Sequence, residues 1–177
     1  MPHKKNIILD LDQTLIYSEF TKDFKKSAKT NKFVHKKLDS DYITFERPYL
    51  QVFLDYIFKK YNVAIWTAAN KSYAVAIINK FILVKPGRKL DFVFYSDHCD
   101  MSKKQKRGLK GLSILWEYFA IRGYNEENTF IVDDNNEVNR IQKKNCYHIP
   151  PFDYNKSGSE DDVELLRLIQ TIKDLNQ

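Results

Sequence analysis

Cysteine is scarce in this sequence, and it contains no long apolar run. The 177 residues include only two cysteines, Cys99 and Cys146, so no disulfide framework of the kind found in small secreted domains is expected. Free thiols fit a reducing, intracellular setting. The apolar run that begins at Ile7 is too short for a signal peptide, and polar residues interrupt the segment 74–84. These absences favour an intracellular protein of the nucleus or cytoplasm that has no membrane partner.

The overall composition is that of a globular chain with a basic charge. Hydrophobic residues make up 43% of the sequence, which suits a single domain over residues 1–177 with a real core. The net charge of +6 favours an anionic partner such as a phosphate group, an acidic peptide or a nucleic acid. Solubility alone accounts for this charge equally well.

Apolar segments alternate with segments of helical periodicity along the chain. Continuous apolar runs predict buried strands, and apolar residues that recur every three or four positions predict helices. The predicted strands are 6–12, 41–46, 62–67, 90–96, 128–134 and 146–149. The predicted helices are 48–61, 70–83, 112–121, 136–144 and 159–175. This alternation predicts an α/β domain with a mainly parallel sheet.

Three of the four main strands end in polar residues of catalytic type. Asp10 and Asp12 end the first strand, Thr67 ends the second, and Asp133 and Asp134 end the fourth. In parallel sheets, ligands bind beyond the carboxyl ends of the strands. Carboxylates gathered there repel one another and push one pKa up, and a divalent oxygen-binding cation such as Mg²⁺ would relieve the repulsion. With a threonine hydroxyl and a lysine, such a site could hold a transferring phosphoryl group.

Several short motifs carry a family resemblance. DLDQTL at 10–15 matches the D-x-D-x-T signature of the haloacid dehalogenase (HAD) superfamily of aspartate-nucleophile phosphatases. RPYL at 47–50, WTAA at 66–69 and VDD at 132–134 resemble its FCP/SCP branch, the small C-terminal-domain (CTD) phosphatases, also called the NLI-interacting-factor family. KGL at 110–112 resembles the lysine motif of this branch. The resemblance implies a HAD-like, Rossmannoid three-layer fold with a minimal cap.

The resemblance also implies catalytic roles. Asp10 would be the nucleophile that forms an aspartyl-phosphate, and Asp12 would be the general acid and then the base. Thr67 would hydrogen-bond a phosphoryl oxygen. Lys110 would neutralise the phosphate, although Lys103, Lys104 and Lys106 lie in the same predicted loop.

Metal and substrate contacts are implied in the same way. Mg²⁺ would be held by Asp10, the backbone carbonyl of Asp12, and Asp134. Asp133 would complete this acidic group by orienting Lys110 or a metal-bound water. On the substrate side, Thr14 would steady the loop with its hydroxyl near Asp12. Phe20 would contact the substrate peptide or else pack under its loop.

Each of these residues also has a purely structural interpretation. Asp10 and Asp12 could cap the end of a strand, Thr67 could cap the next helix, and Asp133 and Asp134 could cap the helix after them. The tripeptide HCD at 98–100 lacks partners at any zinc-site spacing. The basic run 103–107 could be a nuclear-import signal, a phosphate-binding edge or a solvated loop.

The sequence departs from the family at two positions near the expected substrate site. Ser96 stands where the small phosphatases usually carry an arginine, and Gly111 replaces the acid after the motif lysine. The segments 17–47 and 67–110 leave no room for a large cap. An open site suits a phosphate displayed on a macromolecule, flanked here by the lysine-rich stretch 22–37.

Together these features predict a Mg²⁺-dependent phosphoserine or phosphothreonine protein phosphatase, with an RNA polymerase II CTD-like peptide as the type of substrate. One alternative keeps the chemistry and acts on a nucleic-acid 3′-phosphate. Another is a non-catalytic scaffold or assembly protein that retains the fold.

Overall fold

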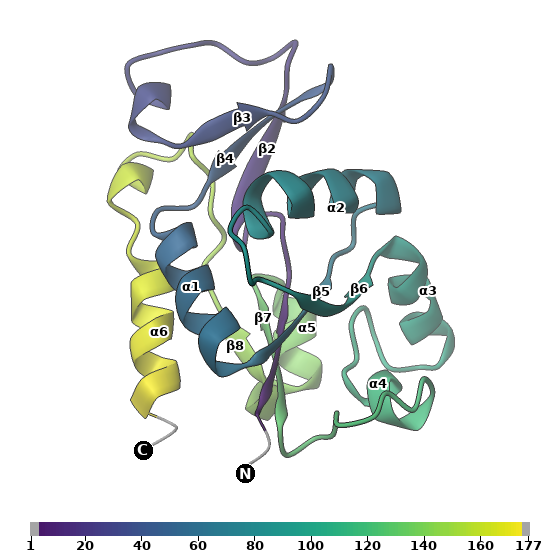
Figure 1. Ribbon diagram of the computed structural model, residues 1–177. Coiled ribbons are helices and arrows are strands. Elements are labelled where there is room, and N and C mark those ends of the chain that lie inside the picture. The colour runs from purple at the N-terminus through teal and green to yellow at the C-terminus, as the bar shows by residue number, and fades with distance from the viewer. Residues whose placement is uncertain (1–3, 175–177) are drawn as a thin grey trace.

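A five-stranded parallel sheet forms the centre of the structure, a computed structural model that describes residues 4–174 (Figure 1). Its strand order is β6-β5-β1-β7-β8, and every neighbouring pair runs parallel. The strands are β1 (Asn6–Leu9), β5 (Asn62–Trp66), β6 (Leu90–Phe94), β7 (Thr129–Asp133) and β8 (Cys146–His148). The predicted α/β domain with a mainly parallel sheet is therefore confirmed.

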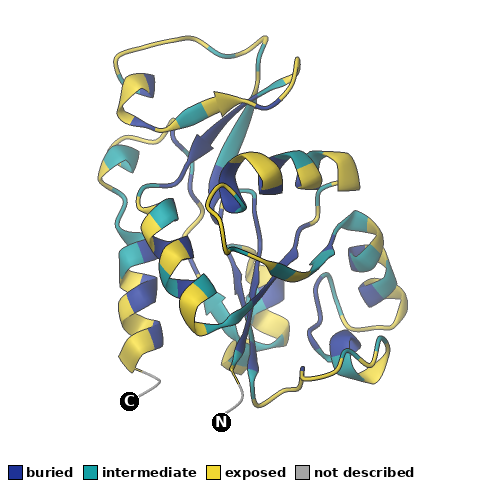
Figure 2. Ribbon diagram, viewed as in Figure 1, coloured by how far each residue is buried: buried dark blue, intermediate teal, exposed yellow. Residues whose placement is uncertain are grey.

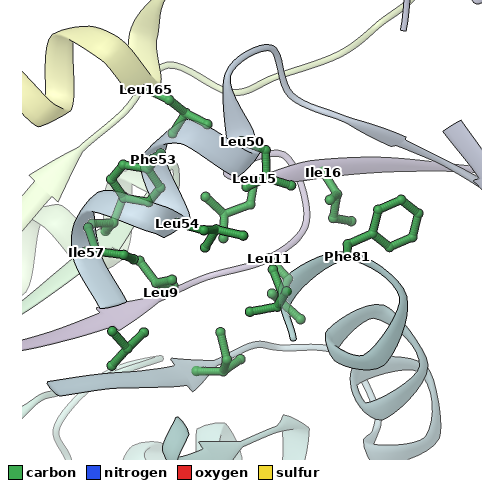
Figure 3. Close-up of a cluster of buried hydrophobic side chains, with 14 of the residues drawn as sticks. Leu9, Leu11, Leu15, Ile16, Leu50, Phe53, Leu54, Ile57, Phe81 and Leu165 are labelled. Atoms are coloured by element: carbon green, nitrogen blue, oxygen red, sulfur yellow. The ribbon is translucent and has the colours of Figure 1, made fainter. Parts of the chain in front are cut away.

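Helices cover both faces of the sheet, which gives three layers. Successive side chains of a strand point to opposite faces, so Ile7 and Leu9 join one hydrophobic cluster while Ile8 joins the other. Figure 3 shows Leu9 beside Phe53 and Ile57 in the first cluster. This cluster is closed by α1 (Leu50–Lys60), α2 (Lys71–Ile77) and α6 (Glu164–Asp174), and the other by α3 (Ser96–Lys104), α4 (Ser113–Glu117) and α5 (Asn136–Ile141).

Burial follows these layers. In Figure 2 the central strands are dark blue and the outward helix faces are yellow. A π-helical turn (Ile78–Ile82) extends α2, and short 3-10 turns lie at Thr30–Lys32, Lys143–Asn145 and Ser159–Asp161. Among the helices of residues 4–174, none combines the length and the apolar character needed to cross a membrane.

A second, antiparallel sheet stands beyond one end of the central sheet (Figure 1). Its strands are β2 (Ile16–Phe20), β3 (His35–Lys37) and β4 (Tyr42–Glu46), in the order β2-β4-β3. Only β4 was predicted. The Phe45 ring stacks on Tyr154 at 3.7 Å between centroids, so the chain near the carboxyl terminus covers this small sheet.

Several predicted element boundaries were wrong, among them the end of the first strand at Leu9 instead of 12 and the end of α5 at Ile141 instead of 144. Residues 96–104 form helix α3, whereas the sequence predicted a strand to 96 and a loop after it. The predicted helix 112–121 is the five-residue α4, which ends at Glu117, and Ala120 beyond it adopts a left-handed conformation with φ 48°. The last helix begins at Glu164, whose backbone N–H is capped by the Asp162 carboxylate.

The buried Arg47 holds the second sheet and the last helix in place. Its guanidinium forms an ion pair with Asp162 at 2.9 Å and donates to the carbonyl of Thr14 at 3.1 Å. Arg47 is therefore a structural residue that links the loop after β1 to the start of α6.

Candidate active site

The carboxyl ends of β1, β5 and β7 meet at a small cleft of about 180 Å³. Its lining includes the predicted nucleophile, the predicted acid, the strand-end threonine, the motif lysine and the aspartate pair. They are Asp10, Asp12, Thr67, Lys110, Asp133 and Asp134. The structure thus brings these predicted site residues to one place, although they span more than a hundred positions in the sequence.

Lys110 lies buried between two carboxylates. Its Nζ is 2.7 Å from Asp10 Oδ1 and 2.7 Å from Asp133 Oδ2, and the residue is 2% exposed. Burial opposes the charged form, but attraction to Asp10 and Asp133 outweighs it and raises the pKa of Lys110. The alternatives Lys103, Lys104 and Lys106 are all exposed, so Lys110 is the lysine that the structure places in the cleft.

Gln142 fixes the backbone on both sides of Gly111. Its amide nitrogen donates to the Lys110 carbonyl at 2.8 Å, and its amide oxygen accepts from the backbone N–H of Leu112 at 2.9 Å. No sequence signal indicates this role, because Gln142 belongs to a polar segment with no motif. The glutamine holds the loop that carries Lys110.

Three carboxylates form a group that could hold a cation. Asp10, Asp133 and Asp134 each offer an oxygen atom, and these atoms lie within 4.8 Å of one another. Burial raises the pKa of both Asp133 and Asp134, and the negative charge of Asp10 raises it further. An all-oxygen anionic donor set matches the preference of Mg²⁺, so these residues fit the predicted metal.

Thr14 lies elsewhere than predicted. Its hydroxyl is 3.0 Å from Asp10 Oδ2 and 3.1 Å from Asp134 Oδ1, rather than near Asp12. The Asp134 backbone N–H also donates to this hydroxyl. Thr14 has no exposed surface, so it holds the two carboxylates in place and does not line the substrate side of the cleft.

The Asp12 carboxylate is separate from the acidic group and contacts Tyr73. The Tyr73 hydroxyl donates to Asp12 Oδ1 at 2.5 Å and lies 2.6 Å from Ser18 Oγ. The pKa of Asp12 is raised to about 6, because burial and the charge of Asp10 raise it by more than the hydrogen bond from Tyr73 lowers it. Sequence reasoning missed Tyr73. One signal could have found it: Tyr73 carries a hydroxyl and stands next to Ala74, which lies on the buried face of the predicted helix 70–83.

Thr67 is a buried residue that lines the cleft, whereas Phe20 lies outside it. The Thr67 hydroxyl oxygen accepts from the Ala69 backbone N–H at 3.1 Å, which leaves its own proton to donate. Phe20 is 49% exposed and stacks on Tyr42 with centroids 4.9 Å apart. It lines a hollow of about 610 Å³ that also touches Asp12, so it is not packed under its loop.

The HCD tripeptide has structural contacts. The His98 ring stacks on Phe94 at 4.0 Å, and the Cys99 thiol donates to the Thr67 carbonyl at 3.7 Å. Within residues 4–174, no cluster of metal-ligating side chains includes either of them.

The sequence and the fold were compared with those of known proteins. The sequence model of the NLI interacting factor-like phosphatase family matches residues 5–177. The chain belongs to this family.

The chain is similar to viral and vertebrate proteins. It is 46% identical over 174 residues to the CTD phosphatase-like protein 355R of Invertebrate iridescent virus 6, covering 93% of this chain and 94% of that protein. It is 27% identical over 176 residues to the ubiquitin-like domain-containing CTD phosphatase 1 of Homo sapiens, covering 97% of this chain. It spans 50% of the length of the human protein.

Solved structures share the fold. The fission yeast RNA polymerase II CTD phosphatase Fcp1 matches with a TM-score of 0.64 and 16% identity, over 97% of this chain and 62% of that chain. A haloacid dehalogenase-like family protein from Streptococcus pneumoniae matches with a TM-score of 0.56 and 11% identity, over 97% of this chain and 100% of that chain. The predicted HAD-like fold is confirmed, and the family supports a hydrolase of the phosphatase class.

The two departures from the family pattern, Ser96 and Gly111, have different surroundings in the structure. A Cβ atom on Gly111 would lie 2.3 Å from the carbonyl oxygen of Arg107, so only glycine fits this turn. Ser96 is half-buried as the first residue of α3, and its backbone N–H donates to the Ala69 carbonyl. The replacement at Gly111 is therefore required by the tight loop that carries Lys110.

Proposed function

We propose that this protein is a Mg²⁺-dependent phosphoprotein phosphatase that acts on phosphoserine or phosphothreonine through an aspartyl-phosphate intermediate. The observation that carries the proposal is the separation of two neighbouring carboxylates. Asp10 faces Lys110 and the acidic group, whereas Asp12 faces Tyr73. Two carboxylates in different environments suit a nucleophile and a proton donor.

The first step forms the intermediate. The Asp10 carboxylate attacks phosphorus, and the bond from phosphorus to the serine or threonine oxygen breaks. Asp12 gives its proton to that departing oxygen. A pKa near 6 keeps a useful fraction of Asp12 protonated near neutral pH.

The second step releases phosphate. Asp12, now a carboxylate, takes a proton from a water molecule whose oxygen attacks the phosphorus. The bond from phosphorus to the Asp10 oxygen breaks, which restores the Asp10 carboxylate and frees inorganic phosphate.

Charge around the phosphoryl group is balanced by several residues. Lys110 lies against Asp10, and the free proton of Thr67 can be donated to a phosphoryl oxygen. Asp10, Asp134 and the backbone carbonyl of Asp12 would hold Mg²⁺, with Asp133 orienting Lys110 or a bound water. When bound, the ion offsets the negative charge on the phosphoryl oxygens.

The shape of the site supports a macromolecular substrate. The cleft of about 180 Å³ has room for little more than a phosphoryl group. The segment that could have closed over it forms the small sheet of β2, β3 and β4 instead. The viral relative is named as CTD phosphatase-like, and fission yeast Fcp1, which shares the fold, is named as an RNA polymerase II CTD phosphatase. A CTD-like phosphopeptide is the substrate that we propose here.

A comparison of two substrates tests this proposal. The values of kcat/KM would be measured with Mg²⁺ on a phosphoserine peptide and on a 3′-phosphorylated oligonucleotide. We expect faster turnover of the peptide. Faster turnover of the oligonucleotide would favour a nucleic-acid 3′-phosphatase, and turnover of neither by folded protein would favour a scaffold.

A further inference from the structure

A second cavity lies behind the loop that carries Lys110. It has a volume of about 610 Å³ and is bordered by α4, the end of α5 and the 3-10 turn Lys143–Asn145. We call it the basic groove, and its cationic lining residues are Lys106, Arg107, Arg140, Lys143 and Lys144. None of them has a part in the chemistry described above.

Most of these cations are available to a ligand. All five are exposed, and within residues 4–174 only Arg107 forms an ion pair, with Glu117. The lining cations outnumber the lining carboxylates five to two. Trp116 adds an apolar wall, and Ile141 is 38% exposed beside it. This composition suits an anion attached to a partly apolar chain.

The groove is connected to the active site through short stretches of backbone. Lys110 points to Asp10, while the next residue, Gly111, lines the groove. Asn135 lines the active-site cleft, and α5 leads from there to Ile141 in the groove. At 1.5 Å per residue, its six residues span about 9 Å. An extended peptide covers that distance in about three residues.

We propose that the basic groove binds a second phosphoryl group on the peptide whose first phosphoryl group lies at Asp10. The preferred substrate class is then a peptide with two phosphorylated residues about three to five positions apart. This inference rests on the proposed phosphopeptide activity.

The carboxylates of the groove favour this ligand over a nucleic acid. Glu117 and Glu126 lie among the lining cations. A continuous phosphodiester backbone would bring phosphates against both carboxylates, whereas one phosphoryl group can contact the lysines alone. Trp116 is half-buried, and the part of its ring that lines the groove can contact a peptide side chain.

Peptide binding to an Asp10→Asn background tests the groove separately from catalysis. Fluorescence anisotropy would give Kd for a singly phosphorylated peptide and for the same peptide with a second phosphoserine four positions away. We expect the second phosphate to tighten binding by about tenfold, the effect of about two solvent-exposed ion pairs. Added salt should reduce that ratio.

Charge reversal identifies the residues involved. Lys143→Glu with Lys144→Glu, and separately Arg140→Glu, should bring the Kd ratio to about one, because each change places a carboxylate where the phosphate binds. Lys59→Glu with Lys60→Glu, on the exposed end of α1, is the matched control and should keep the ratio. Circular dichroism of each variant would establish that it is folded.

Several results would overturn the inference. One is equal Kd for the two peptides in the Asp10→Asn background, and another is a ratio that survives both groove variants. Tighter binding of a single-stranded RNA than of either peptide, lost in the groove variants, would assign the groove to nucleic acid. A separate measurement tests the proposed function: if the wild type does not turn over the phosphopeptide, that function is wrong.

Discussion

Asp10 and Asp12 are two positions apart, yet their side chains have different partners. Asp10 shares Lys110 with Asp133, whereas Asp12 accepts a hydrogen bond from Tyr73 at 2.5 Å. Tyr73 is in turn held by Ser18. Because this hydrogen bond fixes the direction of the Asp12 carboxyl group, we assign Tyr73 as a positioning residue for proton transfer.

Tyr73→Phe should therefore slow reactions that need a proton on the leaving group. We expect kcat on a phosphoserine peptide to fall by about tenfold, since well-placed general acids contribute more than that in total. The fall in kcat should be much smaller on an aryl phosphate, because its acidic leaving group has little need of a proton. Steady-state kinetics on both substrates would measure the difference, with Tyr118→Phe, an exposed tyrosine of the same type, as the control. Equal losses on the two substrates would contradict the positioning role.

At the scale of the element, the turn from Arg107 to Gly111 determines where Lys110 lies. A side chain at position 111 would collide with the Arg107 carbonyl, and Gln142 holds the same backbone from the other side. The cationic end of Lys110 must therefore follow any shift of this turn.

Gly111→Ala should lower both stability and turnover. We expect the free energy of unfolding to fall by about 1–3 kcal/mol, as in other overpacked sites, and kcat to fall as Lys110 moves. Urea unfolding and aryl phosphate kinetics would measure these effects. Gly87→Ala, at an exposed turn with open space around it, is the control and should cost stability through its positive φ without loss of kcat. Unchanged kcat in a destabilised Gly111→Ala protein would show that the turn does not position Lys110.

At the scale of the whole molecule, the acidic group links folding to metal binding. Asp10 comes from the end of β1 and Asp134 from the end of β7, so the group exists only in the folded chain. A ligand that binds only the folded state raises its stability by mass action.

Mg²⁺ should therefore raise the melting temperature. At about 100 times its Kd the ion adds about 2.7 kcal/mol, which for a domain of this size corresponds to about 5–10 °C. Calorimetry with and without Mg²⁺ would measure the shift. It should vanish in Asp134→Asn and persist in Asp100→Asn, an exposed acid on α3. A full shift in Asp134→Asn would exclude this residue as a ligand.

The parts of the fold that sequence patterns predicted are those with continuous local signals. The runs around Ile8, Ile65 and Ile131 are apolar without interruption, so their strands and strand ends could be found. Strand β2 could not, because its Tyr17 packs on Tyr154, which is distant in sequence. Strand β3 is short and largely exposed, and it is recognised only by its pairing with β4.

The same limit applied to individual contacts in the site. Residue types and order located Asp10, Lys110 and Asp134, but the direction of a side chain depends on its tertiary neighbours. The Thr14 hydroxyl therefore lies near Asp10 and Asp134 instead of Asp12, and the hydrogen bond from Tyr73 was not foreseen.

The most direct test of the central claim is hydrolysis of an aryl phosphate near pH 5–7. Wild type and Asp10→Asn would each be measured with Mg²⁺ and with a chelator, after both are shown to be folded. The account predicts turnover by the wild type with Mg²⁺, and only background rates in the other three conditions. Activity that survives in Asp10→Asn or in the chelator would contradict the proposed mechanism, and an inactive but folded wild type would contradict the proposed enzyme.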